Sequence, residues 1–326
     1  MTITNKEDFR KRMNDMGSEG IPFLFVIDFE MKKPVIFPIR EMTQHPILFD
    51  INGYRNYAYH PSKPLNVTLS KFPTPYEEYE KSFKRVRDHL AYGNSFLVNL
   101  TCKTKININK TLKDIFYNSQ AKYKLLINEE YLIFSPEIFI KIQDGTIASY
   151  PMKGTIDAGL PNAEKIILDD KKELAEHVTI VDLIRNDLSR VANKVHVERF
   201  RYIDKIKTNE KELLQVSSEI KGNLPEDYPK RIGDILFSML PAGSISGAPK
   251  QKTVEIIQES EYSERGYFTG VFGYFDGKDL DSGVMIRYIE KQGDDYYFRS
   301  GGGITVNSNP KTEYQEMIDK IYVPVN

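Results

Sequence analysis

The stretch Ser135-Pro-Glu-Ile-Phe-Ile-Lys-Ile-Gln-Asp-Gly-Thr-Ile-Ala-Ser-Tyr-Pro-Met-Lys-Gly-Thr155 predicts a β-hairpin. Isoleucine recurs at every second position from 138 to 142, which is the period of a half-buried strand. Asp144-Gly145 supplies the turn, because glycine adopts positive φ without a steric penalty. Residues 146–150 then form the returning strand.

The hairpin would bring a carboxyl group and an amine to the same end, because Glu137 precedes its first strand and Lys153 follows its second. Pro151 restricts the backbone before Lys153, and Gly154 frees the backbone after it. Such flanking residues suit an amine that approaches a ligand closely. On these residues alone, a solvated loop lysine is the commoner interpretation.

Composition excludes several classes of protein. The 326 residues carry 45 Lys and Arg against 46 Asp and Glu, without a run of like charge, which argues against a nucleic-acid surface. The longest apolar run, Ile21 to Ile27, is far below the ~20 residues that span a bilayer. The first eight residues lack an apolar signal core. The single cysteine, Cys102, excludes an internal disulfide, so we expect a cytoplasmic protein with a buried, inert thiol.

Strands and helices are predicted on both sides of the hairpin. Residues 21–29 and 34–39 predict paired strands, 76–92 an amphipathic helix that Gly93 ends, and 95–105 a further strand. Residues 164–190 predict a second long helix, in which Glu173 and Glu176 project from one face because they are three positions apart. Its apolar stripe would consist of Leu174, Val178, Val181 and Leu188.

A third helix begins near the carboxyl end of the chain. Asn309 is a suitable N-cap and Pro310 a suitable first residue. Glu313 and Glu316 repeat the three-residue spacing, and Lys320 follows one turn later. The ordinary alternative for both glutamate pairs is a solvated acidic face.

Five motifs occur in a fixed order along the chain: Pro151-Met-Lys-Gly-Thr155, Glu176-His-Val178 with Asp182-Leu-Ile-Arg-Asn-Asp187, Pro241-Ala-Gly-Ser-Ile-Ser-Gly-Ala-Pro-Lys250, Arg265-Gly266 with Gly270 and Gly273-Tyr274, and Gly301-Gly-Gly-Ile304. Together they resemble the chorismate-utilising enzymes, the family of anthranilate, isochorismate, salicylate and aminodeoxychorismate synthases. The resemblance implies an α+β fold: a single-domain four-layer αββα sandwich of two antiparallel sheets with outer helices. Residues 1–75 would be a shortened, divergent amino-terminal part, and 76–326 would carry the catalytic core motifs.

The resemblance also implies a magnesium cofactor. Glu176 and Glu316 match the family's Mg²⁺ ligands, and Glu173 and Glu313 match residues that act directly or through metal-bound water. Mg²⁺ prefers oxygen ligands and commonly shares its site with an anionic substrate, and chorismate is a dicarboxylate. We expect substrate contacts from Thr155, Ser246, Lys250, Phe268, Arg287, Gly301, Gly302, Gly303 and Lys320. The three glycines would offer backbone N–H groups with no side chain in the way.

Lys153 resembles the aminodeoxychorismate synthase version of its motif, component I, because anthranilate synthases usually carry alanine there. This implies conversion of chorismate and ammonia to 4-amino-4-deoxychorismate, on the route to 4-aminobenzoate and folate. Lys153 would attack C2, and Glu137 would protonate the hydroxyl that leaves C4. A separate glutaminase subunit would supply the ammonia, because Cys102 lacks a Gly-x-Cys-x-Gly setting.

Two alternatives remain. The first is anthranilate synthase component I, against which Lys153 argues. The second is a non-catalytic subunit, against which the intact set of site residues argues. Two departures from the family pattern also matter: Leu97 stands where isochorismate and salicylate synthases carry a water-activating lysine, and Gln215 stands where a histidine is frequent. Leu97 counts against those two reactions, because it has no basic group.

Overall fold

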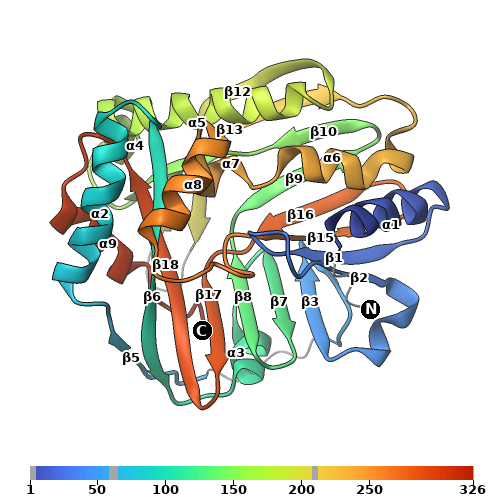
Figure 1. Cartoon of the computed structure of the whole chain (residues 1–326), viewed down its shortest axis with the longest axis horizontal. Helices are drawn as coiled ribbons and strands as arrows, with labels where there is room; N and C mark the ends of the chain where they lie inside the picture. Colours follow the sequence, from blue (N-terminus) through green and yellow to red (C-terminus); the bar gives the residue numbers. More distant parts are fainter. Residues whose placement is uncertain (1–4, 59–64, 208–211, 326) are drawn as a thin grey trace.

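The computed structural model describes residues 5–58, 65–207 and 212–325. Within them the strands form two antiparallel nine-stranded sheets (Figure 1). The first sheet runs in the order β11 (Met152–Asp157), β13 (Glu212–Asn223), β10 (Thr146–Ser149), β9 (Ile138–Gln143), β16 (Leu280–Val284), β15 (Val271–Phe275), β1 (Phe23–Ile27) and β2 (Val35–Pro38), with β12 (Asn193–Lys207) paired to β13. The second runs in the order β14 (Gly247–Ala248), β6 (Leu97–Ile108), β18 (Asp295–Ile304), β17 (Tyr288–Gln292), β8 (Tyr131–Ser135), β7 (Tyr123–Ile127), β3 (Ile47–Ile51) and β4 (Tyr54–Arg55), with β5 (Leu69–Phe72) paired to β6.

Strand β1 shows why the sheets are layered. Successive side chains of a strand point to opposite faces. Phe23, Phe25 and Ile27 pack into one hydrophobic cluster, whereas Leu24 and Val26 pack into another. All five are fully buried, which explains why this strand is apolar throughout instead of alternating.

The cluster that contains Leu24 and Val26 lies between the two sheets, and we call it the inter-sheet core. It combines Phe272 of β15 in the first sheet with Leu125 of β7 and Ile133 of β8 in the second. A second cluster joins the first sheet to helices α1, α5 and α6, and a third joins the second sheet to α3. The layers therefore follow the order helix, sheet, sheet, helix, and the predicted αββα sandwich is confirmed.

The helices cover the outer faces and the ends of the sheets. Figure 1 shows α5 beside the long strands β12 and β13, and α2 beside α9. Within the described residues, no helix is long and apolar enough to cross a membrane. The helices are α1 (Lys6–Ser18), α2 (Tyr76–Ala91), α3 (Leu112–Asn118), α4 (Ala163–Asp169), α5 (Lys171–Ser189), α6 (Ile232–Met239), α7 (Gly243–Ser246), α8 (Lys250–Ser260) and α9 (Pro310–Asp319), with 3₁₀ turns η1 (Ile39–Gln44) and η2 (Tyr228–Arg231).

The predicted hairpin is β9 and β10. Asp144 and Gly145 form its turn with φ of 48° and 77°. The expectation of a loop around Lys153 is wrong, because residues 152–157 form β11, which pairs with β13. Gly154 has φ of 75° and interrupts that pairing between Lys153 and Thr155, so the strand bulges at the lysine.

The other elements expected from the sequence are present, with two corrections. The single helix predicted over residues 164–190 is interrupted at Asp170, whose extended backbone (ψ of 112°) separates α4 from α5. Strands β1 and β2, helix α2, strand β6 and helix α9 lie where the patterns predict them. The apolar stripe of α5 is wrong in its first half, since Leu174 and Val178 are 36% and 47% exposed. The buried face there carries Glu176 and His177 instead, and it becomes apolar only from Ile180 onward.

Candidate active site

Helices α5 and α9 bring their amino-terminal turns to a common site. Asp170 caps α5 by accepting a hydrogen bond from Glu173 N, and Asn309 caps α9 by accepting from Lys311 N and Thr312 N. Helix α5 packs on the first sheet and α9 on β18 of the second. The two glutamate pairs predicted from the sequence therefore reach one site from opposite sheets.

Three lysines lie among the four carboxylates. Lys153 Nζ is 3.1 Å from Glu176 Oε2, and Lys320 Nζ is 2.6 Å from Glu316 Oε1. Lys172 joins the two helices, with Nζ 3.8 Å from Glu176 Oε1 and 3.7 Å from Glu313 Oε1. We call these seven side chains, Glu173, Glu176, Glu313, Glu316, Lys153, Lys172 and Lys320, the carboxylate–lysine cluster.

Burial and mutual repulsion set the charge of the cluster. Burial raises the pKa of Glu173 above its ordinary value, and the neighbouring Glu176 carboxylate adds to the effect. Burial likewise raises the pKa of Glu313. Burial also acts to raise the pKa of Glu316, but the Lys320 ammonium outweighs it and holds that pKa below its ordinary value. The site therefore favours an additional cation near Glu173 and Glu313.

Glycines make room for these charged groups. A Cβ placed on Gly302 would lie 3.4 Å from Glu313 Oε2 and 3.7 Å from both Glu316 Oε1 and Lys320 Nζ. A Cβ on Gly303 would lie 3.3 Å from Lys153 Nζ. The predicted triglycine segment is thus the floor of the cluster, and a side chain on Gly302 or Gly303 would contact the charged groups.

The backbone of the triglycine segment is only half engaged by the sheet. Its residues pair with β6, but the pairing of β18 with β17 ends at Arg299. Lys320 Nζ donates to the Gly301 carbonyl at 2.9 Å. The sequence predicted that the triglycine segment offers free N–H groups to a ligand. The structure adds a second role, because the absence of side chains at these glycines leaves space under the cluster.

Glu137 lies beside the cluster, at the start of β9. Ser244 Oγ donates to Glu137 Oε1 at 2.5 Å. Burial raises the pKa of Glu137, against the effect of the Ser244 hydrogen bond and of the positive charges of Lys153, Arg287 and Lys320. A partly buried carboxyl with a raised pKa suits a general acid. The expected meeting of Glu137 and Lys153 at one end of the hairpin is consistent with this electrostatic contact.

Arg287 occupies a strained backbone position, with φ of 54°. Its guanidinium lies over the Tyr322 ring, and Nε donates to the Tyr322 hydroxyl at 3.2 Å. It contributes positive charge near Glu137, as does Lys320. These two cations are suitable partners for a dicarboxylate.

Four of the predicted substrate-contact residues make their contacts outside the carboxylate–lysine cluster. Ser246 is fully buried and donates to the Ala242 carbonyl at 2.9 Å, because a serine near the end of a short helix bonds the preceding turn. Phe268 packs in the inter-sheet core and is 3% exposed. Lys250 pairs with Asp187. Thr155 is exposed on β11, opposite Gln215.

Two residues of the site were missed by the sequence analysis. Lys172 lies four positions before Glu176 on the same helix, a spacing that predicts an ion pair. Ser244 stands two residues before Ser246 in the same motif, and only the tertiary structure shows that Ser244 is the one facing Glu137.

Cys102 and His177 are both unsuited to chemistry at this site, although Cys102 is only partly buried. Burial raises the pKa of the Cys102 thiol to about 12, which argues against a nucleophilic thiolate. His177 is buried, its Nε2 lies 2.7 Å from Ser218 Oγ, and burial lowers its pKa to about 4. His177 is therefore a neutral packing residue.

The donor atoms of the cluster fit a magnesium ion by type, since Mg²⁺ binds carboxylate oxygens and water. In the part of the chain that the structure describes, no three acidic, histidine or cysteine side chains are gathered as a ready metal site. Lysine ammonium groups lie between the carboxylates instead. Binding of Mg²⁺ would require Glu176 and Glu316 to exchange lysine partners for the ion.

The sandwich fold and this constellation of residues define a chorismate-utilising enzyme. Residues 41–326 match the chorismate binding enzyme family, to which the chain therefore belongs. The "Uncharacterized PabA-like protein" of Haemophilus influenzae is 50% identical over 325 residues, which cover 100% of this chain and 99% of that protein. Aminodeoxychorismate synthase component 1 of Bacillus subtilis is 31% identical over 272 residues, covering 78% of this chain and 57% of that protein.

Two further comparisons support the same family and fold. Anthranilate synthase component 1 of Acetivibrio thermocellus is 33% identical over 266 residues, covering 75% of this chain and 51% of that protein. The crystal structure of MenF, the menaquinone-specific isochorismate synthase from Escherichia coli, superposes with a TM-score of 0.75 at 15% identity, covering 98% of this chain and 82% of that one. At that identity the superposition shows the fold alone.

Proposed function

We propose that this chain is component I of an aminodeoxychorismate synthase, which converts chorismate and ammonia to 4-amino-4-deoxychorismate. The observation that carries the proposal is the position of Lys153. Its amine lies inside the carboxylate–lysine cluster, 3.1 Å from Glu176 and against Gly303 of the opposite sheet. The resembling anthranilate synthases usually have alanine at this place, so the fold does not require a lysine there.

The charges at the site suit a dicarboxylate substrate. Arg287 and Lys320 would each pair with a carboxylate, and the triglycine floor leaves space for the ring. Glu176 and Glu316 would hold Mg²⁺, with Glu173 and Glu313 acting beside it or through water. When bound, that ion neutralises the ring carboxylate and withdraws electrons from the ring.

Glu137 and Lys153 would then perform the substitution. Lys153 Nζ, freed from Glu176 and deprotonated, forms a bond to C2 while the C4–O bond breaks. Glu137 donates its proton to the departing hydroxyl, which leaves as water. Ammonia next forms a bond to C4, and the bond between C2 and Lys153 breaks. The covalent step shields C2 from ammonia and so directs amination to C4.

A glutaminase subunit would supply the ammonia. The only cysteine of the sequence, Cys102, has its pKa raised by burial and is unsuited to glutamine hydrolysis. The purified chain should therefore use ammonium salts but not glutamine. Glutamine-driven turnover by this chain alone would overturn the requirement for a partner.

The decisive experiment is chromatography of the products formed from chorismate, Mg²⁺ and ammonium, with and without an added lyase that releases 4-aminobenzoate. We expect an aminated product that yields 4-aminobenzoate only when the lyase is present. Direct formation of anthranilate would support the second candidate, anthranilate synthase component I, which the 33% identity to the Acetivibrio thermocellus protein favours. Absence of chorismate turnover would support a non-catalytic subunit.

A further inference from the structure

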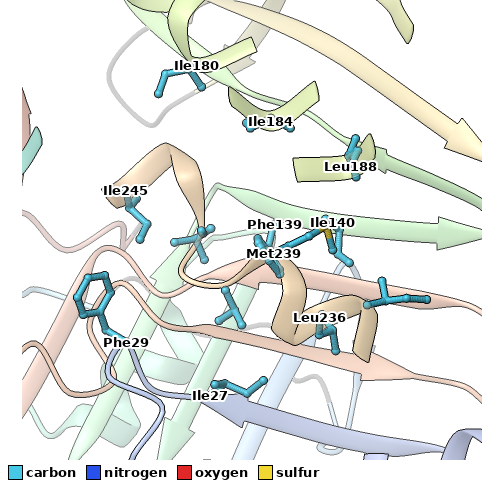
Figure 2. Close-up of a cluster of buried hydrophobic side chains, with 14 of the residues drawn as sticks. Ile27, Phe29, Phe139, Ile140, Ile180, Ile184, Leu188, Leu236, Met239 and Ile245 are labelled. Carbon is cyan, nitrogen blue, oxygen red and sulfur yellow. The ribbon is translucent and has the colours of Figure 1, made fainter. Parts of the chain in front are cut away.

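A small cavity of about 20 Å³ lies next to Glu137. It is lined by β9, the end of β10, helix α5 and residues 239–244 at the junction of α6 and α7. Figure 2 shows side chains of these elements facing one another, and its apolar wall includes Phe139, Ile140, Ile184, Leu188 and Met239. A buried water needs about 10–15 Å³ and two to four polar partners. The cavity therefore has room for one water.

Four polar side chains line the cavity: Glu137, Ser149, Asp187 and Ser244. Consecutive residues of α7 connect the two carboxyl groups. Ser244 Oγ donates to Glu137, while a Cβ placed on the preceding Gly243 would lie 3.4 Å from Asp187 Oδ2. The two acids therefore lie on either side of one short turn and share one cavity.

Asp187 forms a buried ion pair that the proposed chemistry does not use. Lys250 Nζ lies 2.5 Å from Asp187 Oδ2 and donates to the Met239 carbonyl, and the two side chains are 13% and 9% exposed. Burial raises the pKa of Asp187, against the charges of Lys250 and Arg190, and lowers the pKa of Lys250. Both shifts reduce the cost of passing a proton from the ammonium to the carboxylate.

We propose that Asp187, together with Lys250, returns a proton to Glu137 through a water in this cavity after each turnover. The inference rests on the proposed role of Glu137 as general acid, which both candidate reactions require because both expel the C4 hydroxyl. Once Glu137 has given up its proton, its carboxylate takes one from the cavity water. Asp187 replaces that proton with one received from the Lys250 ammonium, which solvent recharges. One proton thus moves from solvent to Glu137.

The test compares the first turnover with later ones. The general-acid role requires a protonated Glu137 at the start of the first turnover, so Asp187→Asn should complete that turnover at the parent rate in rapid-quench measurements. Its later turnovers should be at least ~10-fold slower, since each waits for a slower proton. Asp182→Asn, on the exposed face of the same helix, is the matched control and should behave as the parent. A purely structural role of Asp187 would slow the first turnover as well.

Asp187→Asn alone leaves the Lys250 charge buried without its partner and could destabilise the fold. A double variant therefore distinguishes loss of the proton relay from misfolding. Asp187→Asn combined with Lys250→Met removes both charges. It should fold, bind chorismate and show the same fast first turnover followed by slow ones. Equal rates of first and later turnovers in both variants, or a slowed first turnover in the double variant, would overturn the relay. Failure of the parent to consume chorismate would instead overturn the proposed function.

Discussion

Replacement of Lys153 by alanine removes the one group that the proposed reaction uses as a nucleophile. Lys153 Nζ lies 3.1 Å from Glu176 Oε2 and its side chain is 22% exposed, so the change deletes a half-buried ion pair as well as an amine. Acid–base or covalent assistance of this kind contributes ~10²–10⁴-fold to a rate. That range corresponds to ~3–5 kcal/mol of transition-state stabilisation, and we expect turnover to fall by this amount.

Chorismate binding should survive the change. Glu176 keeps Lys172 at 3.8 Å, and Arg287 and Lys320 remain near Glu137. The dissociation constant for chorismate, measured by calorimetry without ammonium, should therefore stay close to that of the parent. Lys141→Ala is a matched control, because Lys141 forms a 3.0 Å pair with Asp281 on the same sheet and is 33% exposed.

The assay combines chromatography of products with intact-protein mass spectrometry. Enzyme denatured after mixing with chorismate, without ammonium, should carry an adduct in the parent and in Lys141→Ala but not in Lys153→Ala. Lys153→Ala that forms the same product at the parent rate would refute the nucleophile. An adduct mapped to another residue, such as Lys250, would assign that role elsewhere.

Four further outcomes are expected. Glu176→Gln and Glu316→Gln should each weaken Mg²⁺ binding in calorimetry and reduce metal-dependent turnover severely. Full activity of both variants, or of the parent in a chelator, would contradict the assignment of these residues as Mg²⁺ ligands. Burial holds the pKa of Glu137 above its ordinary value of 4.5, so its acid form persists to higher pH and turnover should decline as the pH rises through the raised pKa. The folded state binds this proton more tightly than the unfolded chain does. The free energy of unfolding of the parent, relative to that of Glu137→Gln, should therefore fall as the pH rises above 4.5. A pH-independent difference in denaturant titrations would contradict the raised pKa. Gly303→Ala should lower turnover without unfolding the protein, because its Cβ would lie 3.0 Å from Leu97 Cδ1 and 3.3 Å from Lys153 Nζ. Parent-like activity would show that both side chains can move away freely.

Local signals in the sequence were sufficient for elements whose ends depend on backbone chemistry. The Asp144-Gly145 turn and the Asn309-Pro310 start of α9 follow from positive φ and from side-chain capping, which neighbouring residues alone determine. The sandwich itself followed from the family motifs, since strand patterns do not specify which strands pair.

The apolar stripe of α5 failed for a physical reason. A helix normally buries its apolar face, yet the first half of α5 buries Glu176 and His177 and exposes Leu174 and Val178. The polar face is stabilised by Lys153 of β11 and by Ser218 of β13. Those partners are distant in sequence, so a hydrophobic pattern cannot reveal them.

The same limit applies to Ser244 and Lys172 in different degrees. The ion pair of Lys172 with Glu176 could have been predicted from the sequence, because the two residues are four positions apart on one helix. The contact of Lys172 with Glu313 could not, since α5 and α9 are separated by more than a hundred residues. Ser244 and Ser246 are indistinguishable by residue type, and only the path of α7 decides which hydroxyl reaches Glu137.

The candidate site lies between the two sheets. Helix α5 and strand β11 contribute residues from the first sheet's side, and α9 and β18 contribute residues from the second sheet's side. Activity should therefore depend on the folding of the whole chain. Lys153 Nζ of one sheet lies only 3.3 Å from where a Cβ on Gly303 of the other sheet would stand, so separation of the sheets would dismantle the site before either sheet unravels. We therefore expect no residual activity in a partly opened state, and we expect substitutions in the inter-sheet core, such as at Phe272, to act on catalysis through the population of that state. Enzyme activity thus serves as an all-or-none reporter of inter-sheet cohesion during denaturation.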